Sequence, residues 1–397
     1  MSALPDALPY IVVVCWALVL YSYAGYPIVL GLWAAGAQLK RDLRYISGKA
    51  DRRTADQTDW PMVAVVIAAY NEERHIADRV QNLLEQDYPK DRLRIYIGSD
   101  GSKDRTADIL RQFTDERLKL YLFETNRGKA SVLNELRDRV TEPVVVFSDA
   151  NTCFDHQAIR RLVRWFDDPT VGGVTGELRL RGSNGQNQDS LYWRIEQALK
   201  FFEGRIGGLL GANGAIYAIR RPLWPALRPQ EICDDFCIGM HIPVSGHHLV
   251  YDPSAWAEED TPDNISEEYH RRLRIGVGNF QALCDHPEFF FRTNMATRVT
   301  YVSHKVLRWV TPHLLLLALI LSCVLSPSSS SWQAIAGLQF VGYGITGLLY
   351  RRSARGEPVP GPAKLPTFFF ALNWAFLVAS VRYLRGNQRG AWRRTSR

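Results

Sequence analysis

Two long stretches of the chain carry no charged side chain, and this feature limits the fold more than any other. Residues 7–39 and 309–350 contain no Asp, Glu, Lys or Arg. About 20 apolar residues in a helix are enough to cross the hydrocarbon layer of a membrane. These stretches therefore predict an integral membrane protein, and they exclude a purely soluble, fibrous or disordered chain.

The rest of the chain is polar enough to lie in water. The mean hydropathy of all 397 residues is −0.17, which is slightly polar in spite of the apolar stretches. We therefore expect one soluble domain held by a few membrane helices. Aromatic and basic residues are mixed after this domain, which fits either a helix in the membrane interface or a link between the domain and the membrane. The expected parts are a soluble domain at 60–285, an interfacial segment at 286–306 and membrane helices at 7–35, 309–326, 332–350 and 366–384.

The net charge of +7 comes largely from basic residues beside the apolar stretches. Lys40 and Arg41 follow the first stretch, and Arg351 and Arg352 follow the second. This is the positive-inside pattern, so it indicates membrane topology and lipid contact, and it requires no nucleic-acid partner. We expect the soluble domain to face the cytoplasm at the inner (plasma) membrane. The six cysteines show no zinc-site spacing, and Cys233 and Cys237 have no second pair to complete such a site.

Short β-rich runs alternate with amphipathic helical segments in the first half of the soluble region. This alternation predicts a parallel sheet covered by helices on both faces. Ligands bind such sheets at the carboxyl ends of the strands, so the polar residues that follow each strand are candidates for a site. The expected strands are Val63–Ala69, Leu93–Ile97, Lys119–Phe123 and Val144–Phe147.

Four polar clusters follow these strands or begin a helix. They are residues 71–73, 100–104, 149–151 and the pair Asp234-Asp235. Each cluster alone is typical of an ordinary helix cap. Together, however, carboxylates at one edge of a sheet repel each other and need a cation to offset their charge. A divalent metal held by carboxylates and substrate phosphates would do this.

Six segments in a fixed order resemble glycosyltransferase family 2, the enzymes of the GT-A fold. Within that family the chain is similar to the membrane-bound synthases of hyaluronan, chitin, cellulose and poly-N-acetylglucosamine. The resemblance runs from about Val63 to Gln281. The segments are IAAYNEE at 67–73, SDGSKDRT at 99–106, NRGKASVLN at 126–134, FSDAN at 147–151, CDDF at 233–236 and RRLRI at 271–275.

The resemblance implies an α/β GT-A domain with a mixed, Rossmann-like sheet, inserted between transmembrane helices. It also implies Mg²⁺ or Mn²⁺ as cofactor, held by Asp149 and Asn151, and Asp235 as the general base. The diphosphate would contact Arg271 and Arg274. The donor nucleotide would contact Ala69, Asn71, Glu72, Asp100, Lys129 and Asp149, and the acceptor would contact Trp193, Asp234 and Ile275.

Two positions depart from the family pattern. Asn151 stands where the metal motif has a second Asp, so one ligand charge is lost and Asp149 should dominate the metal contact. Ile275 stands where processive members have Trp, and Ile offers no ring on which a sugar can stack. Alternatives remain for other residues. Asp234 could be the base in place of Asp235, Arg271 and Arg274 could form a solvated helix face, and Trp193 could be a core aromatic.

The sequence predicts a membrane-anchored inverting β-glycosyltransferase of polysaccharide or exopolysaccharide synthesis. It would move a sugar from a UDP-sugar to a glycan or lipid-linked acceptor. The first alternative is a processive synthase that exports its own polymer, which would need an export partner or a homo-oligomer because four helices are few for a channel. The second is a transport or scaffold subunit with a decayed domain. The presence of Asp100, Asp149 and Asp235 together argues against decay.

Overall fold

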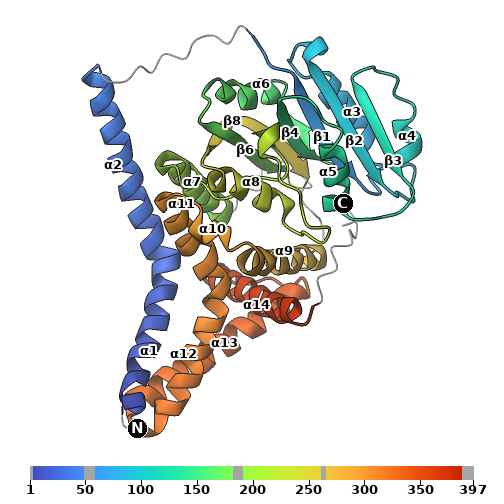
Figure 1. Cartoon of the computed structure of the whole chain (residues 1–397). Coiled ribbons are helices and arrows are strands. Elements are labelled where there is room, and N and C mark those ends of the chain that lie inside the picture. Colours follow the sequence, from blue (N-terminus) through green and yellow to red (C-terminus); the bar gives the residue numbers. More distant parts are fainter. Residues whose placement is uncertain (1–2, 49–58, 182–190, 261–264, 387–397) are drawn as a thin grey trace. The chain divides into compact units, whose positions relative to one another are not determined.

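The computed structural model describes residues 3–48, 59–181, 191–260 and 265–386 of the chain (Figure 1). These residues form two compact units. The sheet unit contains residues 30–48, 59–181, 191–260 and 286–300, and the helical unit contains residues 3–29, 265–285 and 301–386. Each unit is described by itself.

The first half of the sheet is parallel, as the alternation of strands and helices predicts. In the register of these strands Ala69 lies beside Ser99, and Ala68 lies beside Asp149. The carboxyl ends of the four strands therefore meet at one edge. Their order in the sheet is β3-β2-β1-β4, and their bounds are Val63–Ala69 for β1, Leu93–Asp100 for β2, Leu118–Phe123 for β3 and Val144–Asp149 for β4.

The second half of the sheet is mixed. β7 runs antiparallel to β4 and to β6, whereas β6 and β8 are parallel to each other. The mixed sheet implied by the family resemblance is therefore confirmed, and the fully parallel sheet applies only to the first half. The full order is β3-β2-β1-β4-β7-β6-β8-β5, with bounds Cys153–Phe154 for β5, Val171–Arg181 for β6, Tyr217–Arg220 for β7 and His248–Asp260 for β8.

Helices cover both faces of the parallel half, and the alternation of side chains along β1 assigns the faces. Val63, Val65 and Ile67 point into one apolar cluster with residues of α3 and α6. On the other face Gly98 leaves room for Val132 of α5. The helices of this unit are α3 Ile76–Leu84, α4 Thr106–Leu110, α5 Lys129–Arg137, α6 Ala158–Val163, α7 Leu191–Ile206, α8 Asp234–Val244, α10 Glu288–Phe291 and α11 Met295–Thr300.

In the helical unit α1 packs against α12. Val12 and Cys15 of α1 form a buried cluster with Ala318 and Leu325 of α12. α14 packs along α9, where Gly276 allows a close approach of Ala379. The long helices are α1 Ala3–Leu20, α2 Tyr26–Ile46, which continues into the sheet unit, α9 Ile265–Asp285, α12 Leu307–Leu325, α13 Ser330–Ala354 and α14 Lys364–Leu384.

Two π-helical turns, Tyr21–Gly25 and Tyr301–Val306, interrupt these helices and contact each other. The Ser22 hydroxyl donates to the carbonyl oxygen of Ser303 at 3.2 Å, and the Tyr21 and Ser303 hydroxyls lie 2.9 Å apart. The first turn comes just before Pro27, whose ring and missing N–H disturb the regular ladder of hydrogen bonds. The helix therefore widens before Pro27 and does not end there.

Three helical runs in the described part of the chain are long and apolar enough to cross a membrane. They are Ala7–Ile46, Met295–Ser328 and Gly361–Leu384. The membrane helices predicted at 7–35, 309–326 and 366–384 fall within them. The helix predicted at 332–350 is present as α13 but is not among the three, so a fourth crossing stays a prediction. The interfacial role of 286–306 also stays a prediction; the segment forms α10, α11 and the second π-helical turn.

Candidate functional site

The loop after β1 is fixed to the loop after β2 through Asn71. Asn71 has a left-handed φ of 56°, which a residue other than glycine rarely adopts. Its amide carbonyl accepts from the backbone N–H of Lys103 at 2.7 Å, and its own N–H donates to the Ser102 hydroxyl at 3.1 Å. These bonds stabilise a strained backbone position at the carboxyl edge of the sheet.

The next two residues of the same loop extend this connection. The backbone N–H of Glu72 donates to the Thr106 hydroxyl at 2.8 Å, and that of Glu73 donates to the Asp104 carboxylate at 3.1 Å. The Asp104 carboxylate also accepts from the N–H of Thr106, the first residue of α4, at 3.0 Å. The two segments singled out in the sequence at 67–73 and 99–106 thus form one rigid border of the site.

Asp100 stands at the end of β2 and is fully buried. Its two carboxylate oxygens accept from the backbone N–H groups of Arg127 and Gly128, at 2.9 and 2.8 Å. Gly101 brings the backbone close to Thr125, at a position where any Cβ would collide with that residue. Asp100 therefore holds the loop that leads into α5, and a direct contact with a nucleotide stays a prediction.

Lys129, the first residue of α5, joins two carboxylates from different elements. Its ammonium lies 3.0 Å from Asp149 at the end of β4 and 3.2 Å from Asp234 at the start of α8. Burial lowers the pKa of Lys129, but the charges of Asp149, Asp234 and Asp235 outweigh it and raise the pKa above its usual value. Lys129 is therefore a permanent cation among three carboxylates.

The two neighbouring carboxylates of α8 have different surroundings. Burial raises the pKa of Asp234 to about 6, with Lys129 opposing the shift and Asp235 and Asp149 adding to it. Asp235 is half-buried, and one of its carboxylate oxygens accepts from the N–H of Gly214 at 2.9 Å. A side chain at Gly214 would collide with that carboxylate. The glycine thus sets the orientation of Asp235.

Asn151 is held by a residue that the sequence analysis did not single out. Its amide NH₂ donates to the buried carboxylate of Glu259 on β8 at 3.1 Å. The amide oxygen is then turned away from Glu259, because the oxygen and the nitrogen lie on opposite sides of the amide carbon. An Asp in this place would set two carboxylates against each other. Asn151, unlike an ionised Asp, can donate to Glu259 in this place.

Tyr217 is a second residue that the sequence analysis missed. It is buried on β7 and stacks on Phe147 with ring centroids 4.6 Å apart. Burial and the charges of Asp234, Asp235 and Asp149 raise its pKa well above the usual value. Its hydroxyl has no hydrogen-bond partner among the residues that the structure describes. Nothing in the segment around it, a short apolar strand, distinguishes it from a core aromatic.

The remaining predicted residues are not part of this cluster as described. Ala69 is buried at the end of β1, and Trp193 is half-buried on α7. Arg271, Arg274 and Ile275 lie on α9 in the helical unit. Their contacts with a diphosphate or an acceptor stay predictions.

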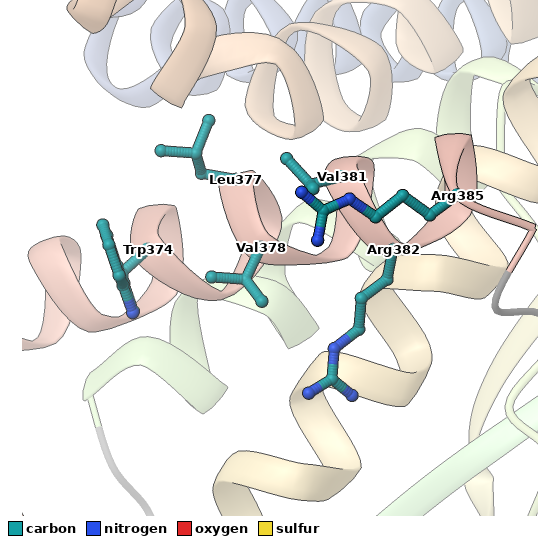
Figure 2. A pocket seen from close by; sticks show the side chains of 6 residues that line it. All are labelled: Trp374, Leu377, Val378, Val381, Arg382 and Arg385. Atoms are coloured by element: carbon teal, nitrogen blue, oxygen red, sulfur yellow. The ribbon is translucent and has the colours of Figure 1, made fainter.

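A hollow on the surface of α14 has a volume of about 490 Å³. Figure 2 shows Trp374 at one end and Arg385 at the other, with Leu377, Val378 and Val381 between them. Its lining is apolar and basic and includes no carboxylate. It therefore lacks the chemistry of a metal or proton-transfer site.

The mixed sheet with loops and carboxylates gathered at one edge defines a GT-A domain. The fold is similar to that of a mannosyltransferase from Pyrobaculum calidifontis, solved in complex with GDP-Man and Mn²⁺. The TM-score is 0.68 at 22% identity, and the match covers 94% of this chain and 99% of the other. At this identity the likeness establishes the fold alone.

The family model for glycosyl transferase family 2 matches residues 64–220 of this chain. The poly-beta-1,6-N-acetyl-D-glucosamine synthase of Staphylococcus aureus is 24% identical over 273 residues, which cover 65% of each chain. The synthase of the same name from Staphylococcus epidermidis is 26% identical over 229 residues, 56% of this chain and 55% of the relative. The matches thus span less than two thirds of these relatives.

Proposed function

We propose that the protein is a membrane-anchored, inverting glycosyltransferase of polysaccharide synthesis, with its sheet unit in the cytoplasm at the inner membrane. It moves a sugar from a nucleotide sugar to a glycan or lipid-linked acceptor. The observation that carries the proposal is the cluster of Lys129, Asp149, Asp234 and Asp235 at the carboxyl edge of a family 2 domain.

The residues present suit Mg²⁺ or Mn²⁺ as cofactor. Both ions prefer oxygen ligands and use few protein carboxylates together with substrate phosphates. The Asp149 side chain is about one-third exposed. The amide NH₂ of Asn151 donates to Glu259, so the amide oxygen points away from that residue. These two residues would hold the ion, which supplies positive charge to the diphosphate leaving group.

The protein's own groups perform the rest of the reaction. The Lys129 ammonium adds positive charge beside Asp149, where the leaving diphosphate develops negative charge. Asp235 takes the proton of the acceptor hydroxyl as that oxygen attacks. Its orientation by the Gly214 N–H keeps one carboxylate oxygen fixed. Attack opposite the leaving group inverts the anomeric carbon, and a β-linked product follows from an α-linked donor. The buried Tyr217 hydroxyl is available to donate to a bound oxygen.

A UDP-sugar is the donor that we propose, because the sequence relatives are synthases of an N-acetylglucosamine polymer. The solved mannosyltransferase, by contrast, was captured with GDP-Man. The test is a panel of UDP- and GDP-sugars with purified full-length protein in detergent and Mn²⁺. We expect release of UDP from one UDP-sugar and a glycosylated product by mass spectrometry. Turnover of GDP-sugars alone would overturn the choice of nucleotide, and no turnover of any donor with a panel of lipid and glycan acceptors would overturn the proposed function.

Short products are expected from the same assay, because Ile275 offers an acceptor no aromatic plane. Ile275 is about 38% exposed on α9. The product-length distribution at low turnover measures this directly. Long polymer without intermediates would favour the processive alternative. If short products dominate, Ile275→Trp should lengthen them, and an unchanged length would exclude Ile275 from the acceptor site.

A further inference from the structure

A second group of chemically reactive side chains lies within the sheet unit, away from Lys129 and Asp149 in the sequence. It consists of Glu231 before α8, Cys237 within α8 and His286 just before α10. One potential ligand atom from each residue lies within 4.8 Å of the other two. Figure 1 shows α8 and α10 next to each other, and the two helices are in contact.

The spacing of these atoms suits a tetrahedral metal ion. Glu231 Oε1 lies 3.4 Å from Cys237 Sγ, and Glu231 Oε2 lies 3.3 Å from His286 Nε2. Bonds to zinc of about 2.0–2.3 Å separate the ligand atoms of a tetrahedron by about 3.3–3.7 Å. A small rotation of the carboxylate would present one oxygen to both neighbours. The ligand atoms of Cys237 and His286 lie within 4.8 Å of each other, so side-chain rotations would bring the three atoms to this spacing.

The chemistry and burial of the three side chains favour zinc over the hard ions. Thiolate and imidazole are preferred ligands of Zn²⁺, whereas Mg²⁺ and Mn²⁺ favour oxygen. The Glu231 side chain is only 1% exposed and Cys237 is 4% exposed. With the thiol deprotonated and the imidazole neutral, one carboxylate and one thiolate balance the charge of Zn²⁺. An uncompensated charge in such a buried place would be costly.

An independent contact supports His286 as a ligand. Its Nδ1 lies 2.8 Å from the Glu288 carboxylate, on the side of the ring opposite to Nε2. Metal-binding histidines almost always donate their second ring N–H to such a carboxylate or to a carbonyl. That bond fixes the tautomer in which Nε2 is free to bind a metal. The ring also stacks on Phe289 at 4.9 Å, which further holds its orientation.

We propose that Glu231, Cys237 and His286 bind a zinc ion, with a water molecule as the fourth ligand. The ion fastens the segment before α10 to the first turn of α8, which carries Asp234 and Asp235 between two of the ligands. Its role is to hold that turn in place. The sequence spacing of cysteines does not indicate this site, because only one cysteine takes part and His286 is distant in the chain. The proposal does not depend on the proposed function.

The alternative is that hydrogen bonds alone, without a metal ion, connect the three side chains. Burial and the nearby Glu231 carboxylate raise the pKa of Cys237, so without an ion its thiol stays protonated and donates to Glu231. The zinc site and the hydrogen-bonded network each give a partner to the same side-chain atoms. They differ in whether the full-length protein retains a metal and in whether cobalt forms a bond to sulfur.

The experiment measures zinc in tag-free, full-length protein purified in detergent, loaded with Zn²⁺ and passed over a chelating resin. We expect one zinc per chain in the wild type and less than a tenth of that in Cys237→Ser and His286→Gln. Cys233→Ser is the matched control, because Cys233 is also buried but lies outside the ligand group. Asp149→Ala is the second control, and both controls should retain the zinc. Equal zinc in the wild type and Cys237→Ser, or none in the wild type, would overturn the proposal.

Two further measurements protect the test against variants that fail to fold. Wild-type protein loaded with Co²⁺ should show thiolate-to-cobalt charge-transfer absorption, and its absence would overturn the proposal without any variant. Glu288→Gln keeps all three ligands but weakens the orientation of His286. Its zinc affinity should fall about 10- to 100-fold while one ion still binds at saturation. An unchanged affinity would contradict the assignment of His286 Nε2 as a ligand.

Discussion

Asp100 is the last residue of β2 and Asp149 is the last residue of β4 in the same sheet, but the surroundings of the two carboxylates differ. Asp100 is fully buried, and its partners are two backbone N–H groups. The Asp149 side chain is about one-third exposed, and its partner is the ammonium of Lys129. The carboxylate of Asp100 holds a loop through backbone donors, whereas that of Asp149 is partly exposed and is the proposed ligand of the metal. The position of an Asp after a strand therefore predicts where its carboxylate lies. The groups that contact the carboxylate distinguish a structural role from a ligand-binding one.

The largest expected effect separates the two carboxylates of α8. Asp235→Asn keeps the size but removes the basic oxygen, so turnover should fall on the order of a hundredfold or more, the usual scale for a general base. Nucleotide binding should persist. The measurement is steady-state turnover with nucleotide binding by calorimetry, and Asp234→Asn is the matched control. Near-normal turnover in Asp235→Asn with a large loss in Asp234→Asn would move the base to Asp234.

The next effect tests whether Asp149 is available to a metal. In the presence of Mn²⁺, Asp149→Ala should weaken nucleotide binding more than tenfold, and Asn151→Ala should weaken it less, because Asn151 contributes no charge. EDTA should abolish transfer by the wild type, and added Mg²⁺ or Mn²⁺ should restore it. Calorimetric titrations with and without the ion measure this difference. Equal turnover with and without the chelator would contradict the metal.

Asp100→Asn should affect stability more than ligand binding. The Asn amide has one oxygen, whereas the N–H groups of Arg127 and Gly128 each bond to a different oxygen of Asp100. One charge-assisted hydrogen bond worth roughly 2 kcal/mol is therefore lost. The thermal midpoint of the full-length protein in detergent should fall by about 4–8 °C. Asp149→Ala should change this midpoint little, since it also relieves repulsion among the carboxylates. The reverse order of the two midpoints would break the comparison between Asp100 and Asp149.

A pH profile tests the environment of Asp234. Because its pKa is raised to about 6, the folded protein holds this proton more tightly than the unfolded chain does. The associated stability is present below the usual pKa of a carboxyl and is lost as the pH rises through about 6. If ionised Asp234 is needed beside Lys129, kcat/KM should decline below about pH 6. Asp234→Asn, which cannot ionise, should lower kcat/KM at every pH and remove the decline near pH 6, and a decline that stays near pH 6 would assign it to another group.

The smallest effect concerns the strain at Asn71. Asn71→Ala loses the bond from the Lys103 N–H and keeps a Cβ in the left-handed region, whereas Asn71→Gly loses the bond but relieves the strain. Glycine should therefore be more stable than alanine by about 1 kcal/mol. Thermal midpoints of the two variants measure the difference. Equal midpoints would mean that the backbone changes its conformation when the side chain is lost.

The parallel strands and the ordered motifs were predictable from the sequence, because a buried strand followed by a polar cluster carries its signal locally. β6 and β8 were not predicted. β6 contains Gly172, Gly173 and Gly176, and β8 contains Pro253 and ends in acidic residues, so local propensity disfavours both strands. The pairing of β6 with β7 and of β8 with β6 overrides this local propensity.

The site shows the same division between local and distant signals. Asp149, Lys129 and Asp234 were predicted and do meet. Glu259 and Tyr217 were missed, because each enters the site from a strand whose sequence gives no sign of chemistry.

The π-helical turns set where the helical unit is sensitive to chain length. A π-helical turn holds one residue more than an α-helical turn, so removing one residue from Tyr21–Gly25 would restore regular α-helix there with little rotation of α1. Removing one residue between Cys15 and Tyr21 would instead turn the preceding part of α1 by about 100°. Val12 and Cys15 would then leave Ala318 and Leu325 of α12. One-residue deletions are therefore expected to be tolerated within the π-helical turn and not in the α-helical part of α1.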